Sequence, residues 1–345
     1  MRRVTTLASV IFAGALALTA CGGDDTASPA ASGGPTSDIQ VGLAYDIGGR
    51  GDQSFNDSAA LGLDKAAADF GVGTKELEAS NTETDADKAE RLRLLAEGGY
   101  NPVIAIGFAY ATALAEVAPE YPDTNFAIVD DSSVEEPNVA GLVFTEEQGS
   151  FLVGTVAAQA STTGKIGFVG GVNTPLIQKF QAGYVAGAEA VNPDIKVQVK
   201  YLTQAPDFSG FNDPAKGNTA AGGMFDNGAD VVYHAAGGSG SGVFDAAAAA
   251  GGLAIGVDSD QYLTAAPEVK DVVITSMIKR VDVAVYDYIQ SAVDGATLTG
   301  VQTFDLAAEG VGYSLSNPAV EPYTAETDAY ADQIINGEIT VPTTP

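Results

Sequence analysis

The chain alternates short apolar runs with longer segments whose apolar residues recur at helical spacing. Six runs predict buried strands: Ile39–Ala44, Val103–Ile106, Phe126–Val129, Lys165–Val169, Val231–Tyr233 and Leu253–Val257. A further strand, followed by an amphipathic helix, is expected from Val272 onwards, and a last strand around Val301–Phe304. The segments between them predict helices: Ser54–Phe70, Asp85–Glu97, Ala109–Ala118, Glu146–Gln159, Leu176–Ala190, Ala215–Asn227 and Gly242–Ala250. Because strands that are apolar on both faces need cover on both faces, this order predicts an α/β protein with parallel sheets flanked by helices.

The repeated strand–loop–helix order suggests two similar lobes. A length of 345 residues with 46% apolar residues is enough for two packed cores. We expect an N-terminal lobe of residues 39–145 plus 276–304 and a C-terminal lobe of residues 146–275 plus 305–345. The chain would then cross between the lobes three times, near Thr145, Thr275 and Phe304.

The N-terminus predicts export. Arg2 and Arg3 precede an apolar stretch, Val4–Ala20, that is too short and wrongly flanked for a transmembrane helix, so residues 1–20 are interpreted as a signal peptide. Leu18-Thr19-Ala20-Cys21 resembles the lipobox of bacterial lipoproteins, which implies a lipidated Cys21 and an extracytoplasmic protein anchored to the cell membrane. The small, Pro/Gly-rich residues that follow predict a flexible tether over residues 21–38.

Charge and composition exclude several classes of function. With 16 Lys and Arg against 45 Asp and Glu, the formal net charge is −29, which argues against nucleic-acid partners. The single cysteine, Cys21, and the single histidine, His234, leave too few ligands for a zinc site, and we expect neither a metal nor a cofactor. No nucleophile is paired with an acid or base, so the sequence predicts that the protein is not an enzyme.

Candidate polar contacts lie in the loops that follow the predicted strands. In open parallel sheets ligands bind beyond the carboxyl ends of the strands, so a carboxylate at a strand end points into the binding region. Glycines there let the backbone approach a ligand closely. The predicted polar contacts are Asp46, Asn56, Asp130, Asp258 and the backbone N–H groups of Gly237 and Gly238. His234 is interpreted as a structural residue. The pair Glu146-Glu147 is interpreted as solvated charges.

Several segments resemble one known family. VGLAYDIGGRGDQSFNDSAALGL, KIGFVGGVNTPLIQKFQAGYVAGAEAVNP and TSMIKRVDVAVYDYI, with others in order between Ile39 and Tyr313, resemble the basic membrane protein family of bacterial ABC-transporter lipoproteins. The resemblance implies a two-lobe type I periplasmic-binding-protein fold with three hinge crossovers. It also implies a monomer that binds a nucleoside between its lobes and delivers it to permease and ATPase subunits. Purine nucleosides are the leading expectation, although the sequence leaves purine and pyrimidine open.

The resemblance also assigns aromatic residues and a lysine to the site. The family places a stacking aromatic residue in a DxSFN motif, here Asp52–Asn56, which implies that Phe55 stacks on one face of the base. Phe211 fits the position of the second ring, with Phe180 as its competitor. Lys279, in the SMIKR motif, is implied to contact the ligand.

Two alternatives share the same fold. The protein could be a sensor lipoprotein that signals ligand state to a membrane kinase, or its ligand could be a sugar. The sequence does not separate these from a nucleoside receptor.

Overall fold

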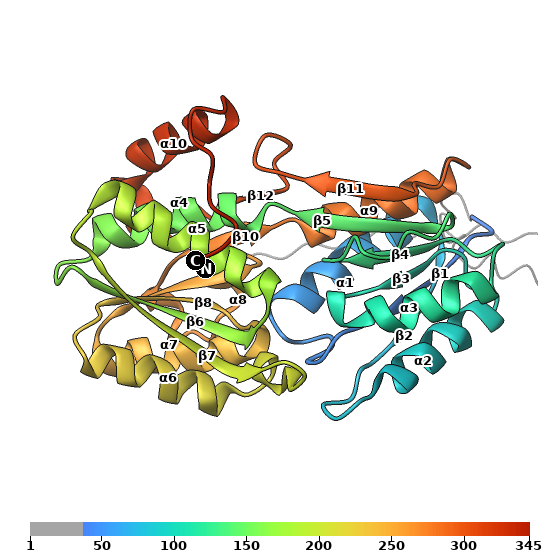
Figure 1. Ribbon diagram of the computed structural model, residues 1–345, viewed down its shortest axis with the longest axis horizontal. Coiled ribbons are helices and arrows are strands. Elements are labelled where there is room, and N and C mark those ends of the chain that lie inside the picture. The colour runs from blue at the N-terminus through green and yellow to red at the C-terminus, as the bar shows by residue number, and fades with distance from the viewer. Residues whose placement is uncertain (1–36) are drawn as a thin grey trace, which may run out of the picture. The chain divides into compact units, whose positions relative to one another are not determined.

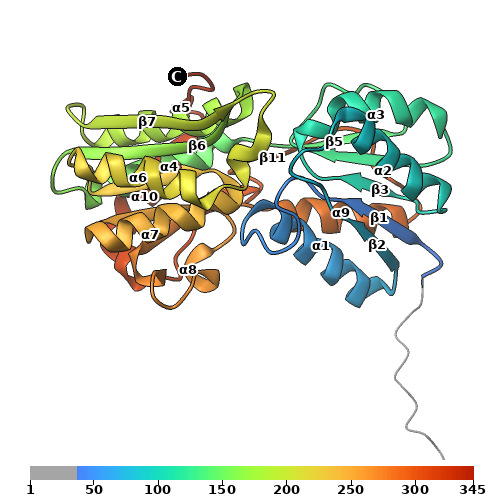
Figure 2. The same ribbon diagram turned by 90° about the horizontal axis from the view of Figure 1, so that it is seen from below.

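The computed structural model describes residues 37–345. The predicted signal peptide, the predicted lipidation site Cys21 and nearly all of the predicted tether therefore lie outside the described residues. None of the helices within residues 37–345 is both long and apolar enough to span a membrane. Two six-stranded sheets organise this part of the chain, each with its own helices (Figures 1 and 2).

The first sheet and its helices form what we call the first lobe. Its strand order is β11-β5-β4-β3-β1-β2, with every pair parallel. The strands are β1 (Gln40–Ala44), β2 (Gly73–Leu77), β3 (Val103–Ala105), β4 (Phe126–Val129), β5 (Val139–Phe144) and β11 (Gly300–Phe304). Helices α1 (Phe55–Phe70) and α9 (Val281–Val293) pack on one face. Helices α2 (Asp85–Glu97) and α3 (Ala111–Val117) pack on the other.

The second sheet and its helices form the second lobe, with strand order β12-β10-β9-β8-β6-β7. The strands are β6 (Lys165–Asn173), β7 (Lys196–Gln204), β8 (Val231–Ala235), β9 (Leu253–Asp258), β10 (Val273–Lys279) and β12 (Val311–Tyr313). Helices α4 (Glu146–Ala160) and α5 (Pro175–Val191) cover one face, where α10 (Glu321–Ile335) packs against α4. Helices α6 (Pro214–Asp226) and α7 (Gly240–Ala250) cover the other face (Figure 1).

Short helical segments lie in the connections. The four-residue helix α8 (Gln261–Thr264) follows β9. The 3₁₀ turns are η1 (Phe108–Tyr110), η2 (Ala118–Glu120), η3 (Phe208–Phe211), η4 (Gly237–Ser239), η5 (Lys270–Val272) and η6 (Pro318–Val320). Turns η1, η3 and η4 come shortly after the carboxyl ends of β3, β7 and β8, respectively.

The predicted fold class, two α/β lobes with parallel sheets flanked by helices, is confirmed. The second sheet departs from it at one edge, because β12 pairs antiparallel with β10. Strands β2, β5, β7 and β12 were not anticipated. The edge strands β2 and β7 are partly exposed and carry polar residues, so no apolar run marks them. Strand β5 follows β4 without an intervening helix, which breaks the expected alternation.

The connections between the two sheets lie side by side. The chain leaves the first sheet after β5, returns to it after β10 and leaves again after β11. Thr145 N donates to Phe304 O at 3.3 Å, and Arg280 N donates to Gly310 O at 2.9 Å, so the connections are hydrogen-bonded to their neighbours. Thr275 lies inside β10, so the second passage comes later in the chain, at Arg280.

Glycines bring α4 and α5 into backbone contact. A Cβ atom added at Gly183 would lie 2.1 Å from Glu147 O, and one added at Gly187 would lie 2.0 Å from Phe151 O. No side chain fits at these distances. This close approach places the first turn of α4, which carries Glu146, beside the middle of α5, about one turn after Lys179.

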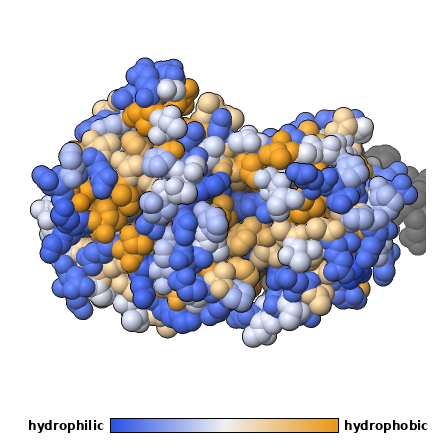
Figure 3. All heavy atoms as spheres, in the orientation of Figure 1, coloured by the Kyte–Doolittle hydropathy of each residue, from blue (hydrophilic) through white to orange (hydrophobic). Residues whose placement is uncertain are grey.

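The face of the described chain in Figure 3 mixes hydrophilic residues with scattered apolar patches. Acidic residues outnumber basic ones nearly threefold, at 45 to 16. Single exposed apolar side chains are normal on a soluble surface, so this face does not point to a binding site.

A candidate ligand-binding cavity between the two lobes

A cavity lies where the carboxyl ends of the strands of both sheets face one another. Its atom-free space measures about 540 Å³, including the opening to solvent. Its first-lobe lining follows β1, β3 and β4: Asp46, Ile47, Asp52, Phe55, Asn56, Gly107, Phe108 and Asp130. The second lobe contributes Leu176, Ile177, Phe180, Phe211, Ala235, Ala236, Gly237, Val257, Asp258 and Lys279. This is the position at which open parallel sheets bind ligands.

All of the predicted ligand contacts except Gly238 line this cavity. Gly238 lies just outside it, where an added Cβ atom would be 3.3 Å from Asn212 Oδ1 and 3.9 Å from Asp52 Cβ. Phe108, which comes three residues after the end of β3, also lines the cavity and is not among the predicted contacts. The strand-end rule that selected Asp130 would have found it, had the rule been applied to aromatic side chains.

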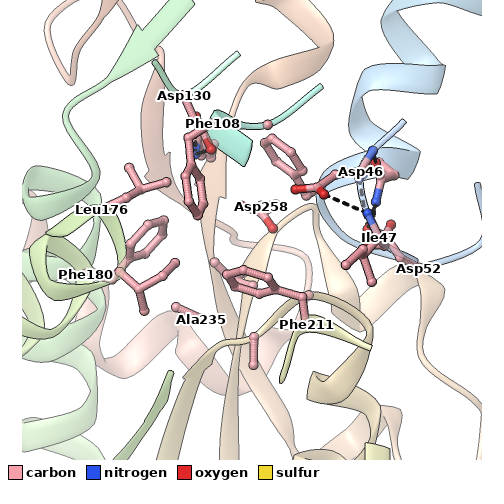
Figure 4. Close-up of a pocket in the computed structure, with 18 residues that line it drawn as sticks. Asp46, Ile47, Asp52, Phe108, Asp130, Leu176, Phe180, Phe211, Ala235 and Asp258 are labelled. Atoms are coloured by element: carbon pink, nitrogen blue, oxygen red, sulfur yellow. Dashed lines mark hydrogen bonds and ion pairs between the residues drawn. The ribbon is translucent and has the colours of Figure 1, made fainter. Parts of the chain in front are cut away.

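Aromatic rings from both lobes point into the cavity. The rings of Phe108, Phe180 and Phe211 surround the central space, which also contains the Asp258 carboxylate (Figure 4). Phe55 lines the same space from the first residue of α1. Both candidates for the second stacking ring, Phe211 and Phe180, are therefore present, and their roles stay predictions.

The β1–α1 loop is shaped by its own side chains. Asn56 Oδ1 accepts the Asp46 N–H at 3.1 Å, and Asn56 Nδ2 donates to Asp52 Oδ2 at 3.0 Å. The Asp52 carboxylate also accepts the backbone N–H groups of Ser54, Asn56 and Asp57. Asn56 and Asp52 therefore hold the loop in place and fix the position of Asp46, whose carboxylate lines the cavity.

Two aspartates end their strands in an uncommon backbone conformation. Asp130 after β4 has φ = 69°, and Asp258 at the end of β9 has φ = 63°. Positive φ is unfavourable for residues other than glycine and clusters at functional sites. Ser54 Oγ of the first lobe donates to Asp258 Oδ2 at 2.6 Å, so one strand-end carboxylate is already bound across the lobes.

Lys279 is the centre of a buried charge cluster. Its Nζ lies 2.6 Å from the Asp130 carboxylate and 3.3 Å from Glu146 Oε1. Glu146 Oε2 in turn lies 3.3 Å from Lys179 Nζ on α5. The interpretation of the pair Glu146-Glu147 as solvated charges is wrong, because the Glu146 side chain is only 1% exposed and Glu147 is only 8% exposed. The position of Glu146 at the first turn of α4 buries it against β10.

Aromatic rings complete the surroundings of Lys279. The Nζ atom lies 5.2 Å from the ring centroid of Phe55, 5.0 Å from that of Phe144 and 5.5 Å from that of Phe180. Burial lowers the pKa of Lys279, but the carboxylates of Asp130 and Glu146 more than offset burial, and the pKa is raised above its ordinary value. The lysine is therefore a fixed cation at neutral pH.

Burial raises the pKa of the aspartates that line the cavity. It raises the pKa of Asp46 to about 6 and that of Asp52 to about 6. Burial likewise raises the pKa of Asp258, and it raises that of Asp130 although Lys279 pulls it down. Several acceptor carboxylates with one cation suit a polar, uncharged ligand that offers hydroxyl and N–H donors.

These shifts predict that acid stabilises the ligand-free protein. Burial raises the pKa of Asp46 from its ordinary value of 3.8 to about 6, so between these values the folded state binds more protons than the unfolded chain. The contribution of Asp46 to stability therefore falls as pH rises through 6. Acidification from pH 7 to 5 should raise the free energy of unfolding by about 1 kcal/mol through this group. Urea unfolding of wild type and Asp46→Asn at both pH values measures it.

In Asp46→Asn, the part of the acid-induced rise in the free energy of unfolding that comes from Asp46 should be absent. The exposed Asp123→Asn is the matched control and should keep the whole gain. An Asp46→Asn variant that gains as much stability as wild type between pH 7 and 5 would show that Asp46 is not desolvated.

Other predicted residues have local roles. His234 is fully buried, and its Nε2 lies 3.0 Å from Gln261 Oε1. Burial lowers the pKa of His234 to about 4, so the ring is neutral at physiological pH. Within residues 37–345, no three His, Cys, Asp or Glu side chains are grouped so that they could hold a metal ion.

Comparisons with known proteins agree with this architecture. A family model described as Bmp, ABC transporter substrate-binding protein PnrA-like, matches residues 39–345. A CD4+ T-cell-stimulating antigen of Listeria monocytogenes is 36% identical, covering 98% of this chain and 97% of that protein. An ABC transporter nucleoside-binding protein, BmpA, of Lactococcus lactis is 34% identical, covering 99% of each chain.

A solved structure supports the fold as well. An ABC transporter solute-binding protein from Aeropyrum pernix is 30% identical and superposes with a TM-score of 0.78, covering 88% of this chain and 93% of that one. The match of the family model extends over both sheets and every residue that lines the cavity. The chain belongs to the Bmp family of PnrA-like ABC transporter substrate-binding proteins.

Proposed function

We propose that this protein is the lipid-anchored, extracytoplasmic receptor of an ABC importer and captures purine nucleosides between its two lobes. The observation that carries the proposal is a single cavity that combines aromatic rings from both lobes with buried carboxylates at strand ends. A nucleoside offers a flat base, a base edge with N–H donors and a ribose diol. The cavity offers a complementary group for each of these parts.

Phe55 and Phe211 are proposed to stack on the two faces of the base. Stacking of a base on an aromatic side chain is worth ~1–3 kcal/mol per ring and does not depend on base identity. Phe211 is held firmly for this role, because a Cβ atom added at Gly171 would lie 2.4 Å from its Cδ1. The ring thus packs directly on the backbone of β6.

The carboxylates are proposed to select the ligand. Asp130 and Asp258 would accept hydrogen bonds from the ribose hydroxyl groups, each worth about 1.5–3 kcal/mol when the acceptor is charged. Asp46, in the β1–α1 loop, would accept N–H donors of a purine edge. Lys279 would donate to a ribose oxygen while it remains paired with Asp130 and Glu146.

Closure of the lobes would couple capture to transport. Ligand contacts from both lobes favour the closed arrangement, so binding shifts the hinge equilibrium toward it. Gln261 Nε2 of the second lobe already donates to Gln53 O of the first at 2.9 Å, and Ser259 Oγ donates to Ser54 O at 3.0 Å. The closed form, tethered through Cys21, would dock on the permease.

Calorimetry on ligand-stripped protein lacking residues 1–20 tests the proposal. Guanosine, inosine and adenosine should bind with micromolar or tighter affinity, while ribose and free bases should bind at least tenfold more weakly, because each lacks one of the two recognised parts. Cytidine and uridine, included as pyrimidine arms, should bind more weakly than the purine nucleosides. Heat with ribose and none with any nucleoside would overturn the proposal in favour of a sugar receptor.

A further inference from the structure

Two contacts join the lobes at the ends of one short segment, η3. The ring of Phe208, at the start of η3, packs edge-on against that of Phe108 of the first lobe, with centroids 5.7 Å apart and planes at 78°. Asn212, directly after η3, donates through Nδ2 to Asn81 Oδ1 of the first lobe at 3.2 Å. Phe211, which lines the cavity, lies between these two contacts in sequence.

The η3 segment is fastened to the second lobe. The buried Ser239 Oγ donates to Gly210 O and accepts the Asp213 N–H, both at 2.7 Å. A Cβ atom added at Gly210 would lie 2.1 Å from Gly171 O, so the backbones of η3 and β6 are in direct contact. Phe208 and Asn212 therefore lie at the two ends of a segment whose backbone is bound to the body of the second lobe.

The first-lobe partners are also held firmly. Phe108 begins the turn η1, in which the Tyr110 hydroxyl donates to Tyr45 O at 2.8 Å. Asn81 belongs to the β2–α2 loop, which is anchored two residues later by Glu83. The Glu83 side chain is 1% exposed and pairs with Arg91 on α2. Both first-lobe partners therefore lie within two residues of a buried side chain that is bound inside that lobe.

We propose that Asn81, Phe108, Phe208 and Asn212 form a clasp that sets the rate at which bound ligand is released. This inference rests on the proposed function. Of the four residues only Phe108 lines the cavity, so Asn81, Phe208 and Asn212 are positioning residues that act on the ligand through lobe closure. They hold the segment that carries Phe211 over the bound ligand.

The clasp acts on the closed state. Parting the lobes breaks both of its contacts, whereas the open protein that first meets a ligand has not yet made them. Weakening the clasp should therefore speed release and leave association nearly unchanged, as is usual for residues that act after encounter. Affinity falls by the same factor as release rises.

Stopped-flow kinetics with inosine tests the clasp. Phe208→Ala should speed release about threefold to tenfold, the range of an aromatic pair, with the association rate within about twofold of wild type. Phe70→Ala is the matched control, because its partner Tyr286, with centroids 5.1 Å away, lies in the same lobe. That control should release inosine at the wild-type rate.

A double-mutant cycle separates the clasp from a general loss of structure. Asn81→Ala and Asn212→Ala should be non-additive in the release rate, since either removes the same contact, and additive in urea unfolding of the ligand-free protein. Release at the wild-type rate from Phe208→Ala and Asn81→Ala, or additivity in release, would overturn the clasp. If calorimetry finds ribose binding instead of nucleoside binding, the same variants measured with ribose decide the clasp separately from the proposed function.

Discussion

Replacing Lys279 with methionine is expected to destabilise the protein by about 3–5 kcal/mol and to abolish ligand binding. Breaking a buried ion pair by removing one partner leaves an uncompensated buried charge, which is the source of this cost. Lys279 Nζ contacts both Asp130 and Glu146. Without it Asp130 loses its cation, and Glu146 keeps only its pairing with Lys179. Urea unfolding and calorimetry with inosine measure the two effects.

The matched variant for this prediction also removes the Asp130 carboxylate, which Lys279→Met leaves without its cation. Lys279→Met combined with Asp130→Leu should recover much of the lost stability, because an apolar pair can replace a buried ion pair at little cost. It should not recover binding, since Lys279 and Asp130 are both proposed ligand contacts. A single Lys279→Met variant as stable as wild type would show that the cluster is solvated and that its burial does not matter.

The fold was predictable because its central strands are apolar on both faces. Strands β1, β3, β4, β6, β8 and β9 each begin within a few residues of a predicted run. Edge strands carry no such signal: in β7 (Lys196–Gln204) exposed polar residues such as Lys200 alternate with apolar ones, so the strand contains no continuous apolar run. The antiparallel β12 has only three residues, fewer than any periodicity needs.

The site was predictable in part for a similar reason. The position of a strand end is a local feature, so Asp130 and Asp258 could be selected without knowing the fold. The partners of a charge are not local. Glu146 resembles any acidic residue at a helix N-terminus, and only the packing of α4 against β10 shows that it neutralises Lys279. The same holds for the contacts of Phe208 with Phe108, which are a hundred residues apart in the chain.

Phe55→Ala is expected to weaken nucleoside binding about tenfold or more, which corresponds to about 1.4 kcal/mol, while the fold stays intact. Phe55 lies on the first turn of α1 and is only partly buried, so its removal leaves no large core cavity. The stacking that it loses, ~1–3 kcal/mol per ring, accounts for the effect. Calorimetry with inosine gives the affinity, and circular dichroism checks the fold. Phe55→Tyr keeps the ring and is expected to bind inosine far more tightly than Phe55→Ala.

The same measurement on Phe211→Ala and Phe180→Ala decides which ring forms the opposite face. Phe211 is partly buried and should behave like Phe55, with a loss of about tenfold and little change in stability. Phe180 is 3% exposed and packs in the core, so its removal should mainly lower the free energy of unfolding, by about 3–5 kcal/mol. If Phe180→Ala folds and loses binding while Phe211→Ala binds like wild type, the two assignments are reversed. Binding at the wild-type level by both Phe55→Ala and Phe211→Ala would mean that the ligand does not lie between these rings.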